Sequence, residues 1–256
     1  MEDMNFPYGF VLYETVLKTS GTTLSAPGLK DRGYIILDGK MRGNIIYRLG
    51  NIMKPSLVFP SGEASVGKKL QILVENRGRQ SSGIDDFKGI TSNVTLNENI
   101  LTNWTCYLID LNQLQKYISE KTRFGRKRLF EIRRNSGKNL VANSETSYIP
   151  TIYAGTFTIP SSQIGDTYFD PAGWGKGQFF LNRNNVGRYW PSLGPQITLY
   201  TPKGFLEQKN RIMLFELEFP GNCLESLRLN CFVNFTDKPN LDGPVTPNPP
   251  RFSNFR

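Results

Sequence analysis

Met213-Leu-Phe-Glu-Leu-Glu-Phe219 is the clearest secondary-structure signal in the chain, because large apolar side chains alternate there with glutamates. Successive side chains of a β-strand point to opposite faces, so this period of two predicts a half-buried antiparallel strand. Leu227–Phe235 alternates in the same way. Further strands are predicted at Phe10–Thr15, Tyr34–Leu37, Leu70–Val74, Tyr153–Ile159 and Gln178–Leu181. A helical pattern is seen only at Leu111–Ser119, and we therefore predict an all-β fold.

The two halves of the chain share a weak internal repeat. Tyr34-Ile-Ile-Leu-Asp-Gly39, followed by Gly43, is similar to Gln178-Phe-Phe-Leu-Asn-Arg183, followed by Gly187. Asp38-Gly39 is typical of a type I′ hairpin turn, which needs positive φ at both central residues. A strand candidate precedes each hairpin and another follows it. The repeat predicts two β-sandwiches in tandem, and a chance alignment of hairpins is the alternative.

Charge and proline content divide the chain further. Lys116–Lys138 holds nine basic and two acidic side chains, a net +7 of the total +9. The rest of the chain is nearly neutral, whereas a nucleic-acid binder spreads its basic side chains over a folded face, so no nucleic-acid partner is predicted. We predict a first β-sandwich domain at 1–115, a basic linker at 116–148, a second β-sandwich domain at 149–238 and a Pro-rich tail at 239–256.

Composition excludes several kinds of chemistry. With no histidine and three cysteines in 256 residues, the chain has no Ser-His-Asp triad, no HExxH zinc site and no Cys₄ zinc site. It also lacks the glycine motifs that bind phosphates. We predict no catalytic residue, no metal and no cofactor. No apolar run is long enough for a membrane span, and the acidic N-terminus does not read as a signal peptide.

Two kinds of covalent site are predicted. Cys223 and Cys231 enclose seven residues, a separation compatible with a disulfide and hence with an oxidising compartment. Cys106 would remain unpaired and is expected to be buried as a small apolar residue. Asn93, Asn103 and Asn234 begin N-x-[ST] sequons, but chance alone gives about that number.

Eight phrases of the sequence resemble one family in order and spacing. They are Tyr8–Thr15, Asp31–Tyr34, Leu73–Arg79, Asp86–Ile90, Leu101–Thr105, Gly173–Gln178, Gly187–Pro191 and Gly194–Gln196. Over residues 6–238 the chain resembles the C-terminal third of animal lysosomal-type β-galactosidases, glycoside hydrolase family 35. The resemblance implies two galactose-binding-like jelly-roll domains without the (β/α)₈ barrel, which carries two catalytic glutamates in the family. It also places Cys223 and Cys231 where the family has a disulfide.

The resemblance implies a non-catalytic role in carbohydrate metabolism. The chain would brace a (β/α)₈ barrel, of the same or a related chain, in a glycosidase that releases terminal β-galactose from glycoconjugates. By itself the chain is expected to be inactive. The alternative functions are a stand-alone galactoside-binding module and a partner-docking protein. A homodimer is a further expected assembly. A lysosomal or extracellular location is implied for a full-length protein, and a cytoplasmic one for a truncated product.

Candidate site residues follow from the same phrases. Trp174, Tyr189 and Trp190 could stack on sugar rings with Arg188 on a hydroxyl, or they could pack the core and its corner. Asp86 and Lys88 are expected to dock the barrel, with an exposed ion pair of little energetic consequence as the alternative. The second hairpin has Asn182-Arg183 where the family usually has Asn-Gly, so its turn must differ or carry strain.

Overall fold

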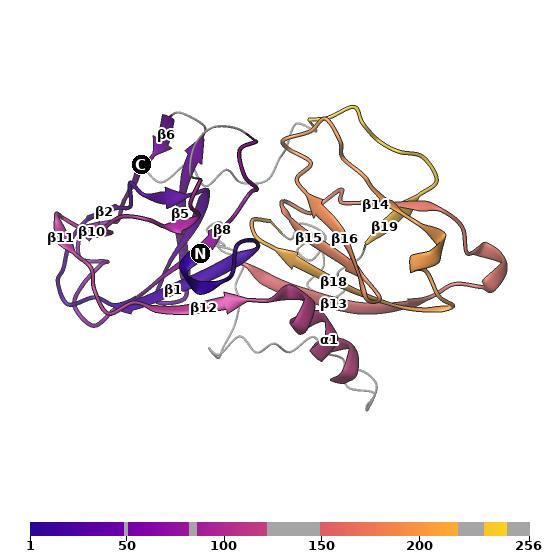
Figure 1. The fold of residues 1–256 in the computed structure, drawn as a ribbon, viewed down its shortest axis with the longest axis horizontal. Coiled ribbons are helices and arrows are strands. Elements are labelled where there is room, and N and C mark those ends of the chain that lie inside the picture. The colour runs from indigo at the N-terminus through magenta and orange to yellow at the C-terminus, as the bar shows by residue number, and fades with distance from the viewer. Residues whose placement is uncertain (49–50, 82–85, 122–148, 220–232, 245–256) are drawn as a thin grey trace. The chain divides into compact units, whose positions relative to one another are not determined.

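The computed structural model describes residues 1–48, 51–81, 86–121, 149–219 and 233–244 (Figure 1). These residues form two compact units, which divide between Leu111 and Asn112. Antiparallel strands make up both units, and α1 (Leu111–Lys121) is the one α-helix within the described ranges. The predicted all-β fold is therefore confirmed, and the jelly-roll connectivity stays a prediction. No helix among these residues is long and apolar enough to cross a membrane.

The first unit is a sandwich of two antiparallel sheets. The larger sheet has the order β12-β1-β8-β4-β5-β6, and the smaller one has the order β11-β10-β2-β7. The bounds in the larger sheet are β1 Phe10–Val16, β4 Arg32–Leu37, β5 Lys40–Arg48, β6 Asn51–Lys54, β8 Lys69–Glu75 and β12 Thr105–Ile109. The smaller sheet consists of β2 Thr23–Ser25, β7 Ser56–Val58, β10 Thr95–Leu96 and β11 Asn99–Ile100. Ile35 and Ile72 of the larger sheet share one buried core with Leu24 and Leu96 of the smaller sheet.

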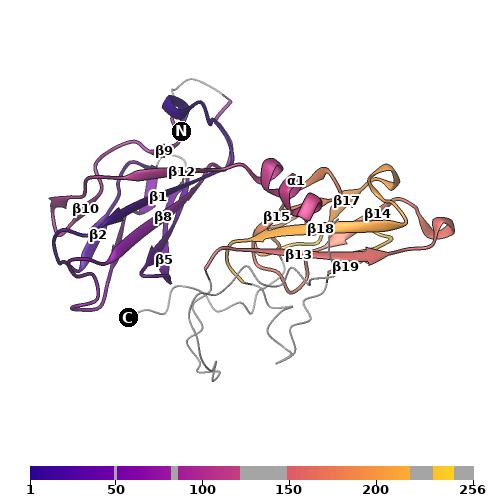
Figure 2. The same ribbon diagram turned by 90° about the horizontal axis from the view of Figure 1, so that it is seen from below.

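The second unit repeats this plan with a more aromatic core. Its larger sheet has the order β13-β18-β15-β16, and β13 and β18 run side by side over their whole length (Figure 2). The bounds are β13 Thr151–Thr158, β15 Gly177–Leu181, β16 Asn184–Tyr189 and β18 Lys209–Glu216. A three-stranded sheet, β17-β14-β19, comprises β17 Leu199–Thr201, β14 Thr167–Asp170 and β19 Asn234–Thr236. Phe169 of β14 stacks on Phe179 of β15 with ring centroids 4.0 Å apart, which joins the two sheets.

The internal repeat is confirmed by strand order and by backbone detail. The order β1-β8-β4-β5 in the first unit matches β13-β18-β15-β16 in the second. Each hairpin has a register shift at the same place, between Ile35 and Ile36 and between Phe179 and Phe180. Gly43 and Gly187 then have φ values of 142° and 145°, a region that favours glycine.

The two hairpin turns are closed by the same hydrogen bonds. The Asp38 N–H donates to the Lys69 carbonyl, and Asp38 Oδ1 accepts from the Lys69 N–H. Asn182 makes the equivalent pair with Arg211. The first turn has positive φ at Asp38 and Gly39, as predicted, whereas Asn182 alone has positive φ in the second. The second turn therefore differs, as the Asn-Arg sequence predicts, and its asparagine occupies the left-handed position.

One prediction about burial was wrong, and three predicted segments lie wholly or partly outside the described residues. β18 was expected to be half-buried, but Met213, Leu214 and Phe215 are all buried. The expectation of one exposed face was wrong, because successive residues of this strand, which point to opposite faces, are buried alike. Most of Leu227–Phe235, most of the basic tract and the tail beyond Pro244 lie outside the described residues. The described start of the tail hydrogen-bonds to the second unit, where the Ile197 N–H donates to the Asn240 carbonyl.

Candidate functional site

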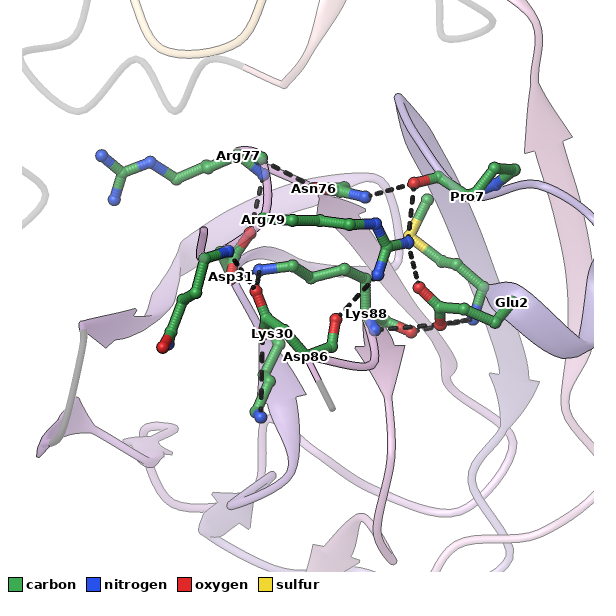
Figure 3. Close-up of polar contacts among 12 residues, drawn as sticks. Glu2, Pro7, Lys30, Asp31, Asn76, Arg77, Arg79, Asp86 and Lys88 are labelled. Carbon is green, nitrogen blue, oxygen red and sulfur yellow. Dashed lines mark hydrogen bonds and ion pairs between the residues drawn. The ribbon is translucent and has the colours of Figure 1, made fainter. Parts of the chain in front are cut away.

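A buried ion network surrounds Lys88 in the first unit (Figure 3). Lys88 Nζ lies 2.7 Å from Asp31 Oδ1 and 2.8 Å from Asp86 Oδ2. The exposed fractions of the three side chains are 4% for Lys88, 10% for Asp31 and 6% for Asp86. An exposed ion pair of Asp86 and Lys88, one of the two alternatives, is therefore wrong, because both side chains point into the protein. Their docking role stays a prediction.

Backbone groups hold the two carboxylates of this network in place. Asp31 follows β3 (Leu29–Lys30), and its Oδ2 accepts from the Arg77 N–H at 2.7 Å. Asp86 Oδ2 accepts from the Gln80 N–H at 3.2 Å. Burial raises the pKa of Asp86, but the hydrogen bonds from Lys88 and Gln80 outweigh it, and the pKa lies below its ordinary value. Asp86 is therefore an anion paired with a buried cation at neutral pH.

Arg79 connects the network to the N-terminal segment. Its Nη1 donates to the Asp86 carbonyl at 2.9 Å, and its Nη2 donates to the Pro7 carbonyl at 3.0 Å and to Glu2 Oε1. Glu2 Oε2 accepts from the Lys88 N–H at 3.0 Å. Partial burial raises the pKa of Glu2, but the hydrogen bonds from Arg79 and Lys88 outweigh it and lower the pKa to about 2. The network thus joins three segments that are distant in sequence.

The sequence analysis missed three members of this network. Asp31 and Arg79 lie inside phrases that carry the family resemblance, which was the available signal, but nothing in the sequence pairs them with Lys88. Glu2 precedes all of these phrases and gives no signal. Lys88 and Asp31 are 57 positions apart in the sequence, and Arg79 and Glu2 are 77 apart. Only the packing of the loops brings these pairs together.

The aromatic residues proposed for sugar binding separate into two groups. Trp174 and Tyr189 are 4% and 1% exposed and belong to the core of the second unit. Trp174 packs edge-on against Tyr153 at 5.1 Å. Neither ring offers a face to a ligand, so the core-packing alternative describes these two residues.

Arg188 and Trp190 remain accessible at the end of β16. Arg188 is exposed, and Trp190 is half-buried. Lys176 Nζ lies 4.8 Å from the centroid of the Trp190 ring, a cation–π contact made by a buried lysine. These two residues are the part of the predicted carbohydrate site that a ligand can reach.

Glu216 is a buried carboxylate that the sequence analysis placed on the polar face of its strand. Its Oε1 accepts from the N–H groups of Lys176, Glu218 and Phe219 at 2.8–3.0 Å. Its Oε2 accepts from the Tyr189 hydroxyl at 2.8 Å and from the Gly175 N–H at 3.2 Å. Burial raises the pKa of Glu216 to about 7, against the lowering effect of these hydrogen bonds.

Phe215 and Tyr189 leave no room for a side chain at Gly177. A Cβ at Gly177 would lie 2.2 Å from the Phe215 carbonyl and 2.5 Å from the Tyr189 hydroxyl. The Gly173–Gln178 phrase is therefore explained by packing, because its backbone passes the carboxylate closely and donates to it. These contacts secure the fold around Trp190 and do not create a reactive group.

The predicted covalent sites have mixed outcomes. Asn93, Asn103 and Asn234 are all exposed, and their glycosylation stays a prediction. Cys223 and Cys231 lie outside the described residues. Cys106 is exposed on β12, so the expectation that it is buried was wrong. β12 is an edge strand of its sheet, and four of its five residues are exposed.

The fold and site define a pair of antiparallel β-sandwich domains whose buried charges are used in structural contacts. Residues 1–110 match a family model described as "Beta-galactosidase, first all-beta domain", and residues 150–210 match one described as "Beta-galactosidase, galactose-binding domain". The chain therefore belongs to the β-galactosidase family and corresponds to its non-catalytic β-domain region.

Curated relatives agree with this assignment. "Beta-galactosidase" from Homo sapiens is 37% identical over 93% of this chain, and the one from Mus musculus is 37% identical over 91%. "Beta-galactosidase 17" from Arabidopsis thaliana is 35% identical over 86%. The matches cover 35%, 36% and 33% of these relatives, so the chain spans about a third of their length.

Proposed function

We propose that this chain braces the catalytic (β/α)₈ barrel of a β-galactosidase-like glycosidase that hydrolyses terminal β-galactose in glycoconjugates. The observation that carries the proposal is the match of both units, in order, to two β-galactosidase domains. The barrel belongs to the same or a related chain, and galactoside glycans are its substrates.

The use of the carboxylates supports a non-catalytic role. A retaining glycosidase needs two accessible carboxyl groups about 5–5.5 Å apart across the scissile bond. Asp31 and Asp86 are instead both paired with one buried lysine, and Glu216 is enclosed by backbone N–H groups. These groups stabilise loops and are not arranged for attack on a sugar.

The proposed location is the lysosome or the extracellular space, within a full-length protein. The exposed sequon asparagines and the proposed Cys223–Cys231 disulfide agree with passage through an oxidising secretory compartment.

The purified 256-residue chain should fail to hydrolyse a chromogenic β-galactoside, because the catalytic glutamates lie on the barrel in this family. The measurement is a p-nitrophenyl-β-galactoside assay at acidic and neutral pH. A chimaera in which this chain replaces the matching third of human β-galactosidase should be active. Turnover that co-purifies with the isolated chain, or an inactive but folded chimaera, would contradict the proposal.

The second unit matches a family model described as a galactose-binding domain. This match favours one alternative function, a stand-alone galactoside-binding module. Arg188 and Trp190 would then contact the sugar, and Trp190→Ala should reduce galactoside affinity about tenfold or more. Tyr200→Ala is a matched control, because Tyr200 is also exposed in this unit. NMR titration with methyl β-galactoside measures both variants, and no binding of the unsubstituted chain at millimolar sugar excludes the module.

A further inference from the structure

We infer that Glu216 is a positioning residue for the site formed by Arg188 and Trp190, and that the charge of its carboxylate controls how Trp190 is presented to a ligand. The inference rests on the galactoside-binding alternative of the proposed function. Glu216 ends β18 and is 2% exposed, so it does not contact a ligand itself. Trp190 directly follows β16 and is half-buried, and β15 lies between these two strands in the sheet (Figure 1).

The first connection between Glu216 and Trp190 is the segment before β15. The Lys176 N–H donates to Glu216 Oε1 at 3.0 Å, and the Lys176 carbonyl accepts from the Leu217 N–H at 2.8 Å. The Gly175 N–H is shared between Glu216 Oε2 at 3.2 Å and the Phe219 carbonyl at 2.8 Å. The side chain of the same lysine lies over the tryptophan ring, with Nζ 4.8 Å from the ring centroid. The carboxylate therefore holds the residue whose cation contacts the tryptophan.

The second connection is Tyr189, which precedes Trp190 directly in the sequence. Its hydroxyl donates to Glu216 Oε2 at 2.8 Å, and its buried ring lies against Phe169 with centroids 5.7 Å apart. Tyr189 also pairs with Gly177, where a Cβ would lie 2.5 Å from the Tyr189 hydroxyl. One carboxylate is thus bonded on both sides of the contact between the lysine and the tryptophan.

Both connections depend on the charge of the carboxylate. Hydrogen bonds to an ionised acceptor are roughly twice as strong as bonds between neutral groups. A proton on Glu216 is placed on Oε2, because Oε1 accepts three N–H bonds, and the new O–H group then faces the Tyr189 hydroxyl oxygen. The Tyr189 hydroxyl changes from donor to acceptor. Burial raises the pKa of Glu216 to about 7, so both forms are populated near neutral pH.

Four other titratable side chains of the described residues belong to the segments packed against Glu216. Lys176 precedes β15, Tyr189 ends β16, Tyr153 of β13 interacts with Tyr189, and Glu218 follows β18. Lysine and tyrosine side chains ordinarily titrate near pH 10, and burial and Glu216 raise the pKa of Tyr189 well above its ordinary value. Glu218 is the second carboxylate of this group, and its replacement is therefore the matched control.

The test follows Trp190 directly, in the 256-residue chain labelled with 5-fluorotryptophan. The chain has three tryptophans, and Trp190→Phe assigns the fluorine NMR resonance of this one. The Trp190 resonance should shift between pH 5 and 8 with a midpoint near the pKa of Glu216, about 7. Trp104 of the first unit should not shift and is the internal reference. Glu216→Gln should remove the titration, and Glu218→Gln should retain it.

Tyr189→Phe separates transmission of the charge from folding. The variant keeps the buried ring and removes the hydroxyl that donates to Glu216, so the shift of the Trp190 resonance should be smaller. Dispersed fluorine resonances report that each variant is folded. A Trp190 resonance that does not move between pH 5 and 8, or that titrates unchanged in Glu216→Gln, overturns the inference.

Ligand affinity separates the inference from the function on which it rests. The affinity for methyl β-galactoside, measured by NMR titration, should be about fivefold or more higher at pH 8 than at pH 5.5, a coupling typical of linked sites. The reason is that the ionised carboxylate holds Lys176 and Tyr189 more strongly. Affinity that does not depend on pH overturns the inference and leaves the binding module standing. A titrating Trp190 resonance in a chain without galactoside affinity supports the positioning role and excludes the module.

Discussion

Replacement of Lys88 with methionine should destabilise the first unit by about 3–5 kcal/mol, because breaking a buried ion pair leaves an uncompensated charge. In this protein two carboxylates, Asp31 and Asp86, would remain buried without their cation. Methionine has a similar length and keeps the packing of the aliphatic chain. Hydrogen-exchange mass spectrometry in increasing urea measures the effect, since it reports on peptides of each unit separately. Peptides of β4 and β8 should lose protection at lower urea.

The control for this substitution is Lys68→Met in the same unit. Lys68 Nζ lies 2.5 Å from Asp38 Oδ2, but the side chains are 44% and 40% exposed. An exposed pair in water contributes little to stability, so this variant should stay close to the unsubstituted chain. Adding Asp86→Asn to Lys88→Met should restore part of the lost stability, because it removes one buried charge. Equal urea midpoints for Lys88→Met and Lys68→Met would show that the buried network is not what stabilises this unit.

The strands were predictable from sequence because their pattern is local. The strand candidates of the sequence coincide with β1, β4, β8, β13 and β15 to within a few residues, and the helical pattern coincides with α1. The internal repeat was also predictable, because each hairpin needs a residue that tolerates positive φ and a glycine five positions later. In the first half these residues are Asp38 and Gly43. In the second half they are Asn182 and Gly187.

The burial of polar residues could not be predicted in this way. Glu216 alternates with apolar neighbours, and this pattern predicts that it faces solvent. It is nevertheless 2% exposed, because the Gly175–Lys176 backbone and the Tyr189 side chain pack against its carboxylate. Lys88 reads as a surface charge, and only the packing of distant loops brings Asp31 and Glu2 to it. Cys106 shows the opposite error, since this small apolar residue is exposed on the edge strand β12. A period of two indicates which residues share a face, but not whether that face is covered.

Glu216 makes the stability of the second unit dependent on pH. Its pKa rises from 4.5 to about 7 on folding, so the folded state binds more protons than the unfolded state between these values. Stability is therefore fully present below pH 4.5 and is lost as pH rises through 7. The loss is of the order of 3 kcal/mol by the linkage relation. Peptides of β15 and β18 should exchange more slowly at pH 5 than at pH 8, after correction for the intrinsic rate.

The first unit should show no such loss of stability between pH 5 and 8, which serves as an internal control. The pKa of Glu2 is lowered to about 2, and that of Asp86 is lowered as well. Their contribution is present above the unfolded values and is lost only as the solution becomes strongly acidic. Between pH 5 and 8 these two groups add no slope. A decrease in stability of both units over this range would contradict the assignment to Glu216.

Glu216→Gln tests the assignment directly, because glutamine resembles the protonated carboxyl group. The amide oxygen can keep the three backbone N–H bonds made to Oε1, and the NH₂ group can donate to the Tyr189 hydroxyl oxygen. The Gly175 N–H then faces another donor, which costs about 1–3 kcal/mol. The variant should be less stable than the unsubstituted chain at pH 5, and its stability should be nearly independent of pH between 5 and 8. A slope that survives in Glu216→Gln would mean that another group titrates, whereas its disappearance would show that the buried Glu216 carboxylate causes the pH dependence.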